Sequence, residues 1–542
     1  MGQALRTGMG AVALGFCLAL SLAARAADDP WAKYEAAGAR IGALRIVTSN
    51  VFDTSKPEES HWLARAANFI HITTRESVIR EALLFKMGDP VNAAAIHETE
   101  RLLRSLSWVQ DATIEPVEIE PGSVQAVVKV HDGWSLMASL KYNHAGGETN
   151  WRIRVHEVNF LGFGKDLLLS HESDPERTTD EIGYRDPLLF GSRWTLDLGY
   201  ATLSDGRSGR FMLERPFYEL SANWSAGVRA ASTQDVEYLY DDNDKVYAFP
   251  AKLTDVTLYA RWQYAFANRT AWRAGVELRA MDASYGALSV LEPYPLPAPD
   301  LAPRRFRGIL GYWGVSQDRF ATYRNLQYMA HTEDINLGWD AEVHAGWMGK
   351  ALGSYEDAWY GEFTAHKGTL LSDSSLLIFD GAGHGFKTGG GSQDVYTDLS
   401  FSFYNQSLPM QTLAANLELT VGSNLYPEDA IYIGGFDGLR GYPYRYRTGD
   451  RRWLFSAEDR IVTPWTFWGL VQVGFVAYVD AGAIRTFDGH FTKTYADVGG
   501  GLRFGNLKST FGRVFLLTVA VPLVKDPGLD SYQIVAGTVI RF

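Results

Sequence analysis

A glycine-rich stretch in the last quarter of the chain carries an arginine beside an aromatic residue, and two carboxylates follow it downstream. Arg440 is followed by Gly441 and Tyr442, and the carboxylates are Glu458 and Asp480. A guanidinium presents a fixed fork of donors that suits carboxylates, and such bonds strengthen where water is partly excluded. A glycine at 441 permits a backbone conformation that a side chain would obstruct. These residue types predict an ion-paired latch, provided that the fold brings them together.

The two carboxylates lie in segments whose side chains alternate between apolar and polar. Asp480 and Tyr478 alternate with an apolar set, so they face the lumen if that set faces lipid. Glu458 shares its parity with Ser456 and is lumenal by the same argument. Asp459 then faces lipid, which is unfavourable at mid-depth, so we expect it at the periplasmic rim or on a bulge.

From Trp134 onward, the chain is a series of alternating segments such as 194–200, 255–264 and 336–347. Period two predicts strands, which a soluble β-sandwich or propeller would also contain. Three features favour a membrane barrel instead: aromatic residues near segment ends, large apolar side chains alternating with polar ones, and about 400 residues without a disulfide. In a membrane, only a closed barrel pairs the backbone groups of every strand. We therefore predict a transmembrane antiparallel β-barrel over residues 133–542.

A count by hand gives roughly twenty strands of about ten residues each. Residues 291–303 contain five prolines and are expected to form a long loop.

No apolar segment in the mature chain reaches the length of a lipid-spanning helix. The composition, 46% hydrophobic and 21% charged, excludes a disordered chain.

Residues 1–26 are expected to be a secretory signal peptide, because Arg6 precedes a short apolar run that ends in Ala24-Arg25-Ala26. The only cysteine, Cys17, lies within it, so we expect no disulfide and no cysteine metal site in the mature chain. Without Arg6 and Arg25, 49 basic residues face 63 acidic ones and the net charge is −14. That balance argues against nucleic acid as a partner.

After a linker at 27–43, residues 44–132 have the pattern of a small α+β domain. A short strand at 44–47 precedes a helix that Thr73 and Glu76 would open as a capping box. Asn92 is expected to cap a second helix, and strands at 113–119 and 124–130 flank a turn. The order is β-α-α-β-β, with an insertion at 53–72 that has near-helical apolar spacing.

The sequence contains no clear motif for catalysis or for cofactor binding. The 12 histidines show no H-E-x-x-H or paired metal spacing, and no Gly-x-Ser-x-Gly elbow or phosphate-binding loop is present. Residues 241–244 are acidic but miss the spacing of a calcium loop, so a solvated loop is the favoured interpretation. We predict no catalytic residue, no enzyme activity, no cofactor and no metal.

The stretch around Arg440 resembles the lid-loop signature of the outer-membrane assembly and translocation superfamily, which includes BamA, TamA and the two-partner secretion transporters. The resemblance places a lid loop at 422–450 and extends to three further motifs. Residues 456–458 resemble the family's Glu-bearing strand, and residues 478–480 resemble its aromatic-x-Asp motif, with tyrosine where Phe or Gly is usual. The last strand resembles the β-signal by which outer-membrane barrels are recognised for insertion, although Val535 occupies a usually polar position. The motif residues are Leu439, Arg440, Gly441, Tyr442, Glu458, Tyr478, Asp480, Gly537, Ile540 and Phe542.

The resemblance implies a barrel of sixteen strands, fewer than the hand count, and makes residues 44–132 a POTRA-like periplasmic domain. Only one such domain fits, whereas assembly factors usually have several. Such a domain can bind an incoming chain at a sheet edge, here 113–119 or 44–47, or it can merely space the barrel from periplasmic partners.

The function implied is insertion or translocation of unfolded outer-membrane or secreted polypeptides at the outer membrane of a Gram-negative bacterium, in contact with its lipid. The alternative is a passive pore or a surface-lipid conduit built on the same barrel. The identity of the client, and whether it is protein or lipid, stay open at this point.

Overall fold

The computed structural model describes residues 29–52, 54–55, 62–106, 108–241, 243–292, 298–329, 332–467, 471–506 and 514–538. The expected signal peptide, part of the 53–72 insertion, Ile540 and Phe542 lie outside these residues. The chain divides into two compact units. The first comprises Met1–Met137, His156–Leu167 and Asp186–Ser192, and the second comprises Ala138–Val155, Leu168–Arg185 and Arg193–Phe542.

The first unit is a small α+β structure. A three-stranded sheet has the order β1-β3-β2, with β1 parallel and β2 antiparallel to β3. Apolar side chains of α4, α5 and the sheet form its core, which includes Ile79, Ile96, Leu103, Ala126 and Val128. The elements in chain order are α2 (Ala32–Ala36), β1 (Arg40–Ser49), α3 (Trp62–Ile70), α4 (Glu76–Ala82), α5 (Ala93–Ser105), β2 (Val109–Glu120) and β3 (Ser123–Asp132).

The two expected helix starts have different outcomes. The predicted capping box is wrong: α4 begins at Glu76, and no side chain caps it. The residues before it are held extended, because Thr74 donates to the Asp132 carboxylate from its backbone N–H at 2.7 Å and from its hydroxyl at 2.8 Å. Asn92 caps α5 as predicted, since its side chain accepts a hydrogen bond from a backbone N–H of the first turn.

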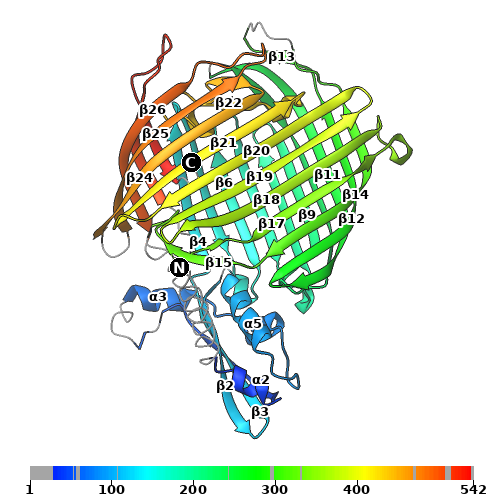
Figure 1. Cartoon of the computed structure of the whole chain (residues 1–542), viewed down its shortest axis with the longest axis vertical. Helices are drawn as coiled ribbons and strands as arrows, with labels where there is room; N and C mark the ends of the chain where they lie inside the picture. The colour runs from blue at the N-terminus through cyan, green and yellow to red at the C-terminus, as the bar shows by residue number, and fades with distance from the viewer. Residues whose placement is uncertain are drawn as a thin grey trace, which may run out of the picture. The chain divides into compact units, whose positions relative to one another are not determined.

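In the described part of the chain, twenty long strands close into the predicted antiparallel barrel, and β13 (Ser289–Val290) is a short extra pairing (Figure 1). The hand count of about twenty is confirmed, and the sixteen strands implied by the resemblance are wrong for this chain. The strands are β4 (Leu136–Ala145), β5 (Glu148–Glu157), β6 (Asp166–Ser173), β7 (Thr178–Asp186), β8 (Thr195–Leu203), β9 (Gly206–Arg215), β10 (Trp224–Asp241), β11 (Asp244–Ala267), β12 (Thr270–Tyr285), β14 (Arg304–Gln317), β17 (Trp339–Met348), β18 (Ala358–Ser372), β19 (Ser375–Thr388), β20 (Gly391–Asn405), β21 (Gln411–Ser423), β24 (Arg451–Phe467), β25 (Val471–Arg485), β26 (Tyr495–Asn506), β27 (Val514–Pro522) and β28 (Gln533–Thr538).

The barrel wall has an apolar outer face and a polar inner face. In β12, Val276 and Leu278 are 51% and 52% exposed, whereas Glu277 between them is 2% exposed. The outward aromatic rings also meet across strands, as Trp272 and Trp313 do with ring centroids 5.6 Å apart. This division suits a lipid-facing exterior and a wet interior, and the prediction of a transmembrane β-barrel is confirmed. None of the helices in the described residues is long and apolar enough to span a membrane.

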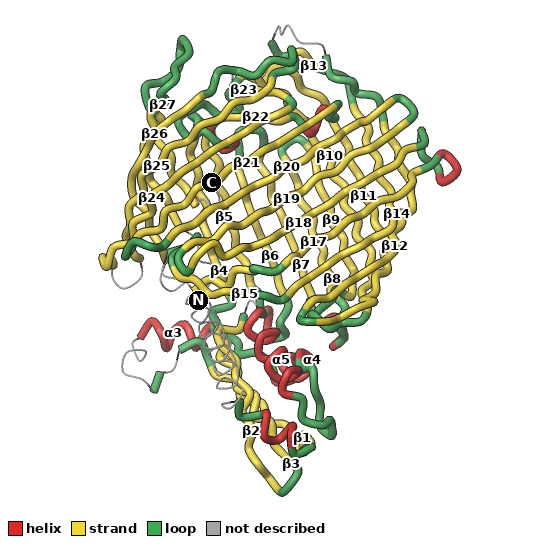
Figure 2. The backbone as a smooth tube through the Cα atoms, in the orientation of Figure 1, coloured by secondary structure: helices red, strands yellow, loops and turns green. Residues whose placement is uncertain are grey.

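Two connections carry structure of their own. Between β21 and β24, the chain forms two single 3-10 turns, η5 (Pro427–Asp429) and η6 (Gly435–Asp437), and a hairpin of β22 (Ile431–Ile433) and β23 (Arg447–Gly449) (Figure 2). This is the expected lid loop, and it has its own apolar core at Ile431, Ile433, Leu439, Tyr442 and Tyr446. A second hairpin, β15 (Phe320–Arg324) with β16 (Thr332–Asn336), lies between β14 and β17 in the chain.

Candidate functional site: a buried arginine that anchors the lid

The Arg440 side chain is fully buried, with 0% of its surface exposed. Its Nε and Nη2 donate to the two oxygens of Asp480, each at 2.7 Å, which is a bidentate pair. Its Nη1 donates to Glu458 Oε1 at 2.7 Å, and Nη2 also reaches Ser456 Oγ at 3.2 Å. The structure therefore brings together the three charged residues that the sequence singled out.

The strand register explains why the two carboxylates converge. In the pairing of β24 with β25, Ser456 lies opposite Asp480 and Glu458 lies opposite Tyr478. All four have the same parity, so they face the lumen on adjacent strands. The Tyr478 ring lies beneath the guanidinium, with Arg440 Cζ 3.3 Å from the ring centroid. The guanidinium therefore stacks on the Tyr478 ring and lies between two carboxylates. Both kinds of contact stabilise its positive charge.

A second arginine extends the network along β24. Arg460 Nε donates to Glu458 Oε2 at 2.7 Å, and its Nη1 donates to the backbone oxygen of Leu326 at 3.1 Å. Glu458 therefore bridges two guanidinium groups, and its charge is shared between the lid and the wall. Charges buried like this stabilise the fold only while their partners are present, and loss of one partner leaves a buried charge unpaired.

Gly441 is required for space rather than for backbone conformation. Its backbone N–H donates to Asp497 Oδ2 at 3.1 Å. A Cβ at this position would lie 2.7 Å from Asp497 Cβ and 3.2 Å from the backbone nitrogen of Pro522. Within the motif, Leu439 has a positive φ of 60°, whereas Gly441 does not. The expectation of a special backbone conformation at Gly441 is therefore wrong, and close packing against the wall is what leaves no room for a side chain.

Gly441→Ala is expected to destabilise the seating of the lid by about 1–3 kcal/mol, because the new methyl group overlaps Asp497. The measurement is urea-induced unfolding of the full chain in lipid vesicles. Gly361→Ala is the matched control, because nothing lies within 4 Å of a Cβ at that position in β18. Equal unfolding midpoints for the two variants would contradict the close packing.

Tyr442 connects the lid to β26 and to the residues that follow β27. Its ring is fully buried, and its hydroxyl lies 2.9 Å from the backbone oxygens of both Ala496 and Val524. The backbone N–H of Ala496 donates back to that hydroxyl at 3.2 Å. Since Arg440 holds β24 and β25, the Arg-Gly-Tyr motif contacts the last strands of the chain one after another.

The following residues of the lid contact the first hairpins of the barrel. The backbone N–H of Tyr444 donates to the backbone oxygen of Gly146, in the β4–β5 turn, at 3.0 Å. Arg445 forms an ion pair with Glu176 in the β6–β7 loop. The barrel closes between β28 and β4, where Ala536 pairs with His144. The lid therefore contacts the wall on both sides of the closing seam.

For two residues near the site, the structure differs from the sequence analysis. Asp459 is not on a bulge, because its pairing with Leu413 and Ala477 is uninterrupted. Since Leu413 lies near the start of β21, Asp459 lies toward the strand end that is opposite the lid. Asp497 was missed, although it is fully buried directly opposite Asp480. Strand parity alone would place Asp497 inward, but its partner is a backbone N–H of the lid, which no sequence pattern marks.

The seam also contains one residue of the expected β-signal. Gly537 lies in β28, and a Cβ there would lie 2.3 Å from Asn143 Oδ1 and 2.9 Å from the backbone oxygen of Tyr142. Close approach of β4 therefore favours glycine at this position. Ile540 and Phe542 lie outside the described residues, so the β-signal stays a prediction.

No protein-family profile and no curated protein matches the sequence. Among solved structures, the chain is similar to BamA from Haemophilus ducreyi lacking POTRA domains 1-3, with 12% identity, 92% of this chain and 84% of that chain covered, and a TM-score of 0.41. It is similar to CdiB from Acinetobacter baumannii, with 12% identity, 92% and 73% covered, and a TM-score of 0.45. It is also similar to OccK7 (OpdD) from Pseudomonas aeruginosa, with 10% identity, 74% and 96% covered, and a TM-score of 0.28. The class of fold, a large transmembrane β-barrel with an internal lid, is defined by the chain's own strand pairings.

Proposed function

We propose that this chain is an outer-membrane protein of the assembly and translocation superfamily, and that it inserts or translocates polypeptide clients. The observation that carries the proposal is the buried ion-pair network of Arg440 with Glu458 and Asp480, made by a lid inside a closed barrel. Residues 44–132 are proposed to be its POTRA-like periplasmic domain, and 133–542 its barrel. No step in this function requires a catalytic residue or a cofactor.

The proposed working cycle opens the seam between β28 and β4. A separated seam exposes two rows of unpaired backbone N–H and C=O groups, and an extended client strand of any sequence can pair with them. The lid opposes this opening, because its motif binds β24, β25, β26 and the residues after β27, while Tyr444 and Arg445 bind the first hairpins. Arg440 is the proposed anchor of these contacts, since its fully buried side chain forms ion pairs with Glu458 and Asp480.

The first unit offers the client two sheet edges. Because β3 is central, β1 and β2 are both edge strands, and they contain the two segments expected from the sequence. On β2, Val117 and Ile119 are exposed apolar side chains, and no further strand of the described residues pairs with the outer side of β2. An edge of this kind accepts an extended chain by adding it as a fourth strand.

A photo-crosslinking amino acid at Val117 is expected to capture a urea-unfolded outer-membrane protein added to the full-length protein, because the edge is open there. The same crosslinker at Arg80, an exposed residue of helix α4 and outside both edge strands, is the control. The measurement is the yield of crosslinked product on a denaturing gel. Equal yields at the two positions would favour the alternative in which this domain only spaces the barrel from its partners.

Depletion of the protein in its native bacterium tests the function as a whole. Loss of specific outer-membrane or secreted polypeptides, with lipids unchanged, is the expected result. A change in surface lipid alone, or ion conductance in planar bilayers without any dependence on a client, would favour the conduit or the pore and would overturn the proposal.

A further inference from the structure

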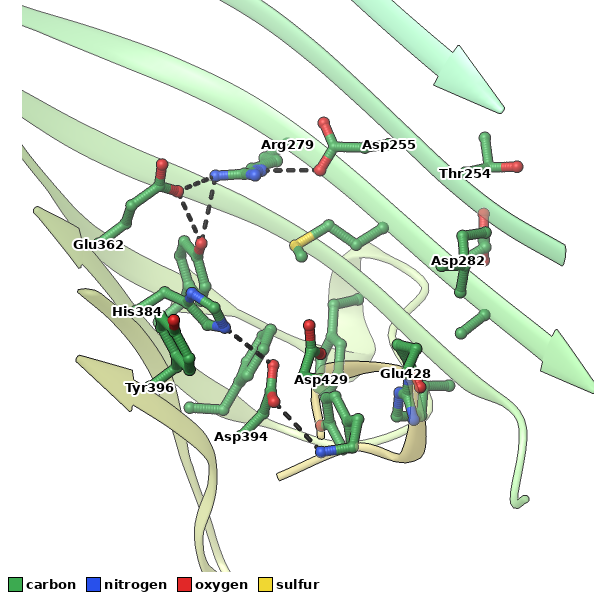
Figure 3. A pocket seen from close by; sticks show the side chains of 18 of the residues that line it. Thr254, Asp255, Arg279, Asp282, Glu362, His384, Asp394, Tyr396, Glu428 and Asp429 are labelled. Atoms are coloured by element: carbon green, nitrogen blue, oxygen red, sulfur yellow. Dashed lines mark hydrogen bonds and ion pairs between the residues drawn. The ribbon is translucent and has the colours of Figure 1, made fainter. Parts of the chain in front are cut away.

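A cavity of about 500 Å³ lies in the barrel lumen, away from the Arg440 site (Figure 3). Its wall is formed by lumenal side chains of β10, β11, β12, β14 and β18 to β20. Its remaining side is the start of the lid, from Tyr426 to Asp429. The whole cavity belongs to the second unit.

Aromatic rings line one side of this cavity. Phe386 is at their centre, stacked on Phe306 at 4.4 Å between ring centroids, 4.8 Å from Tyr360 and 6.2 Å from Tyr426. Two of these rings already hold cations. Arg304 Cζ lies 3.4 Å from the Tyr426 ring centroid, and Arg279 Cζ lies 5.2 Å from that of Tyr360. The cavity surface therefore suits flat or extended cationic groups.

The charge in the cavity is unbalanced. Five carboxylates face it, against two arginines and one histidine, namely Asp255, Glu362, Asp394, Glu428 and Asp429 against Arg279, Arg304 and His384. Four of the five carboxylates have cationic partners. Arg279 binds Asp255 and Glu362, Arg304 binds Glu428, and His384 binds Asp394.

Asp429 is the exception. In the described part of the chain, its carboxylate makes no hydrogen bond or ion pair, and Figure 3 shows it pointing into the cavity with no dashed line reaching it. Burial raises the pKa of Asp429 to about 7, and the neighbouring charges of Asp394 and Glu428 act in the same direction. A cation placed beside Asp429 would relieve this repulsion.

We propose that this cavity binds an organic cation, with Asp429 as its counter-ion and the rings around Phe386 as its wall. The described residues contain no group of His, Cys, Asp or Glu arranged to hold a metal ion, and the aromatic side of the cavity suits an alkylammonium or guanidinium group. Such a group is carried by a lysine or arginine side chain of a polypeptide, or by a free polyamine. The site goes beyond the proposed function, because it requires only the closed barrel and its lid.

The test is calorimetric titration of the purified full-length protein in detergent with two probes, spermidine and a short acetylated lysine peptide. Asp429→Asn is expected to weaken binding of the bound probe at least about ten-fold, the scale of one lost charge-assisted contact. Asp373→Asn, an exposed aspartate in the β18–β19 turn, is the matched control and should bind like the wild type. Binding of the peptide alone assigns the site to polypeptide side chains, and binding of spermidine alone assigns it to polyamines. Failure of both probes, or equal affinity in Asp429→Asn, overturns the proposal.

The affinity for the bound probe should also rise between pH 6 and pH 8. Since the pKa of Asp429 is raised to about 7, its carboxylate is largely neutral at pH 6 and charged at pH 8. The groups that face it are Glu428 on the lid, Asp394 on β20, His384 on β19 and Arg304 on β14. Comparison with Asp429→Asn separates the Asp429 contribution from theirs. An equal pH dependence in the variant and the wild type would exclude Asp429 as the counter-ion.

Discussion

Replacing Arg440 with alanine is expected to destabilise the folded barrel by about 3–5 kcal/mol and to abolish client insertion. The change leaves the carboxylate of Asp480 buried without the bidentate cation that both of its oxygens bind. Glu458 is affected less, because it keeps Arg460. The measurements are urea-induced unfolding in lipid vesicles and the insertion of an unfolded outer-membrane protein into those vesicles.

Two further variants distinguish loss of the lid anchor from loss of barrel stability. Arg269→Ala removes an exposed arginine that pairs with Asp318, and it should change stability by no more than about 0.5 kcal/mol. Arg440→Met combined with Asp480→Asn removes one buried charge of each sign, so it should recover much of the lost stability. The lid would still lack its anchor, and insertion should stay impaired. A stable double variant that inserts clients normally would contradict the role of the ion pair.

A disulfide across the closing seam is expected to stop insertion while the barrel stays folded. Ala536 and His144 are register partners in β28 and β4, so cysteines at these two positions lie at a distance that a disulfide can bridge. The only native cysteine is Cys17, in the expected signal peptide, so no other thiol competes. Oxidation should lower the rate of client insertion at least about ten-fold. This corresponds to an increase of about 1.4 kcal/mol or more in the activation free energy. Reduction of the same sample should restore it.

The control for the seam disulfide is a disulfide of the same kind elsewhere in the wall. Ala226 and Ala260 are partners in β10 and β11, which belong to the uninterrupted part of the barrel. Cysteines at these positions should form a disulfide without effect on insertion. Insertion that continues through an oxidised seam would show that clients do not pass between β28 and β4.

Sequence periodicity predicted the parts of the site that depend on strand parity. The inward direction of Glu458, Tyr478 and Asp480 follows from alternation alone, because the side-chain period of a strand is two. Strand parity does not predict which wall residues bind the backbone of the lid. Asp497 binds the backbone N–H of Gly441, and a backbone donor leaves no mark in the sequence.

The remaining differences also have local causes. The start of α4 was misplaced because Asp132, distant in the sequence, binds Thr74 and holds the preceding residues extended. The family's sixteen strands were a poor guide because strand number depends on how many hairpins the chain supplies. The alternating segments counted in this sequence were the better measure.

In the proposed cycle, the buried lid leaves its seat while a client is inserted. Leu439 tests it most directly, because this residue precedes Arg440 and is only 2% exposed in the closed barrel. A cysteine at position 439 should react slowly with a membrane-impermeant maleimide in the resting protein, and much faster during insertion of an unfolded outer-membrane protein. An unchanged rate of labelling while the client is inserted would contradict the account.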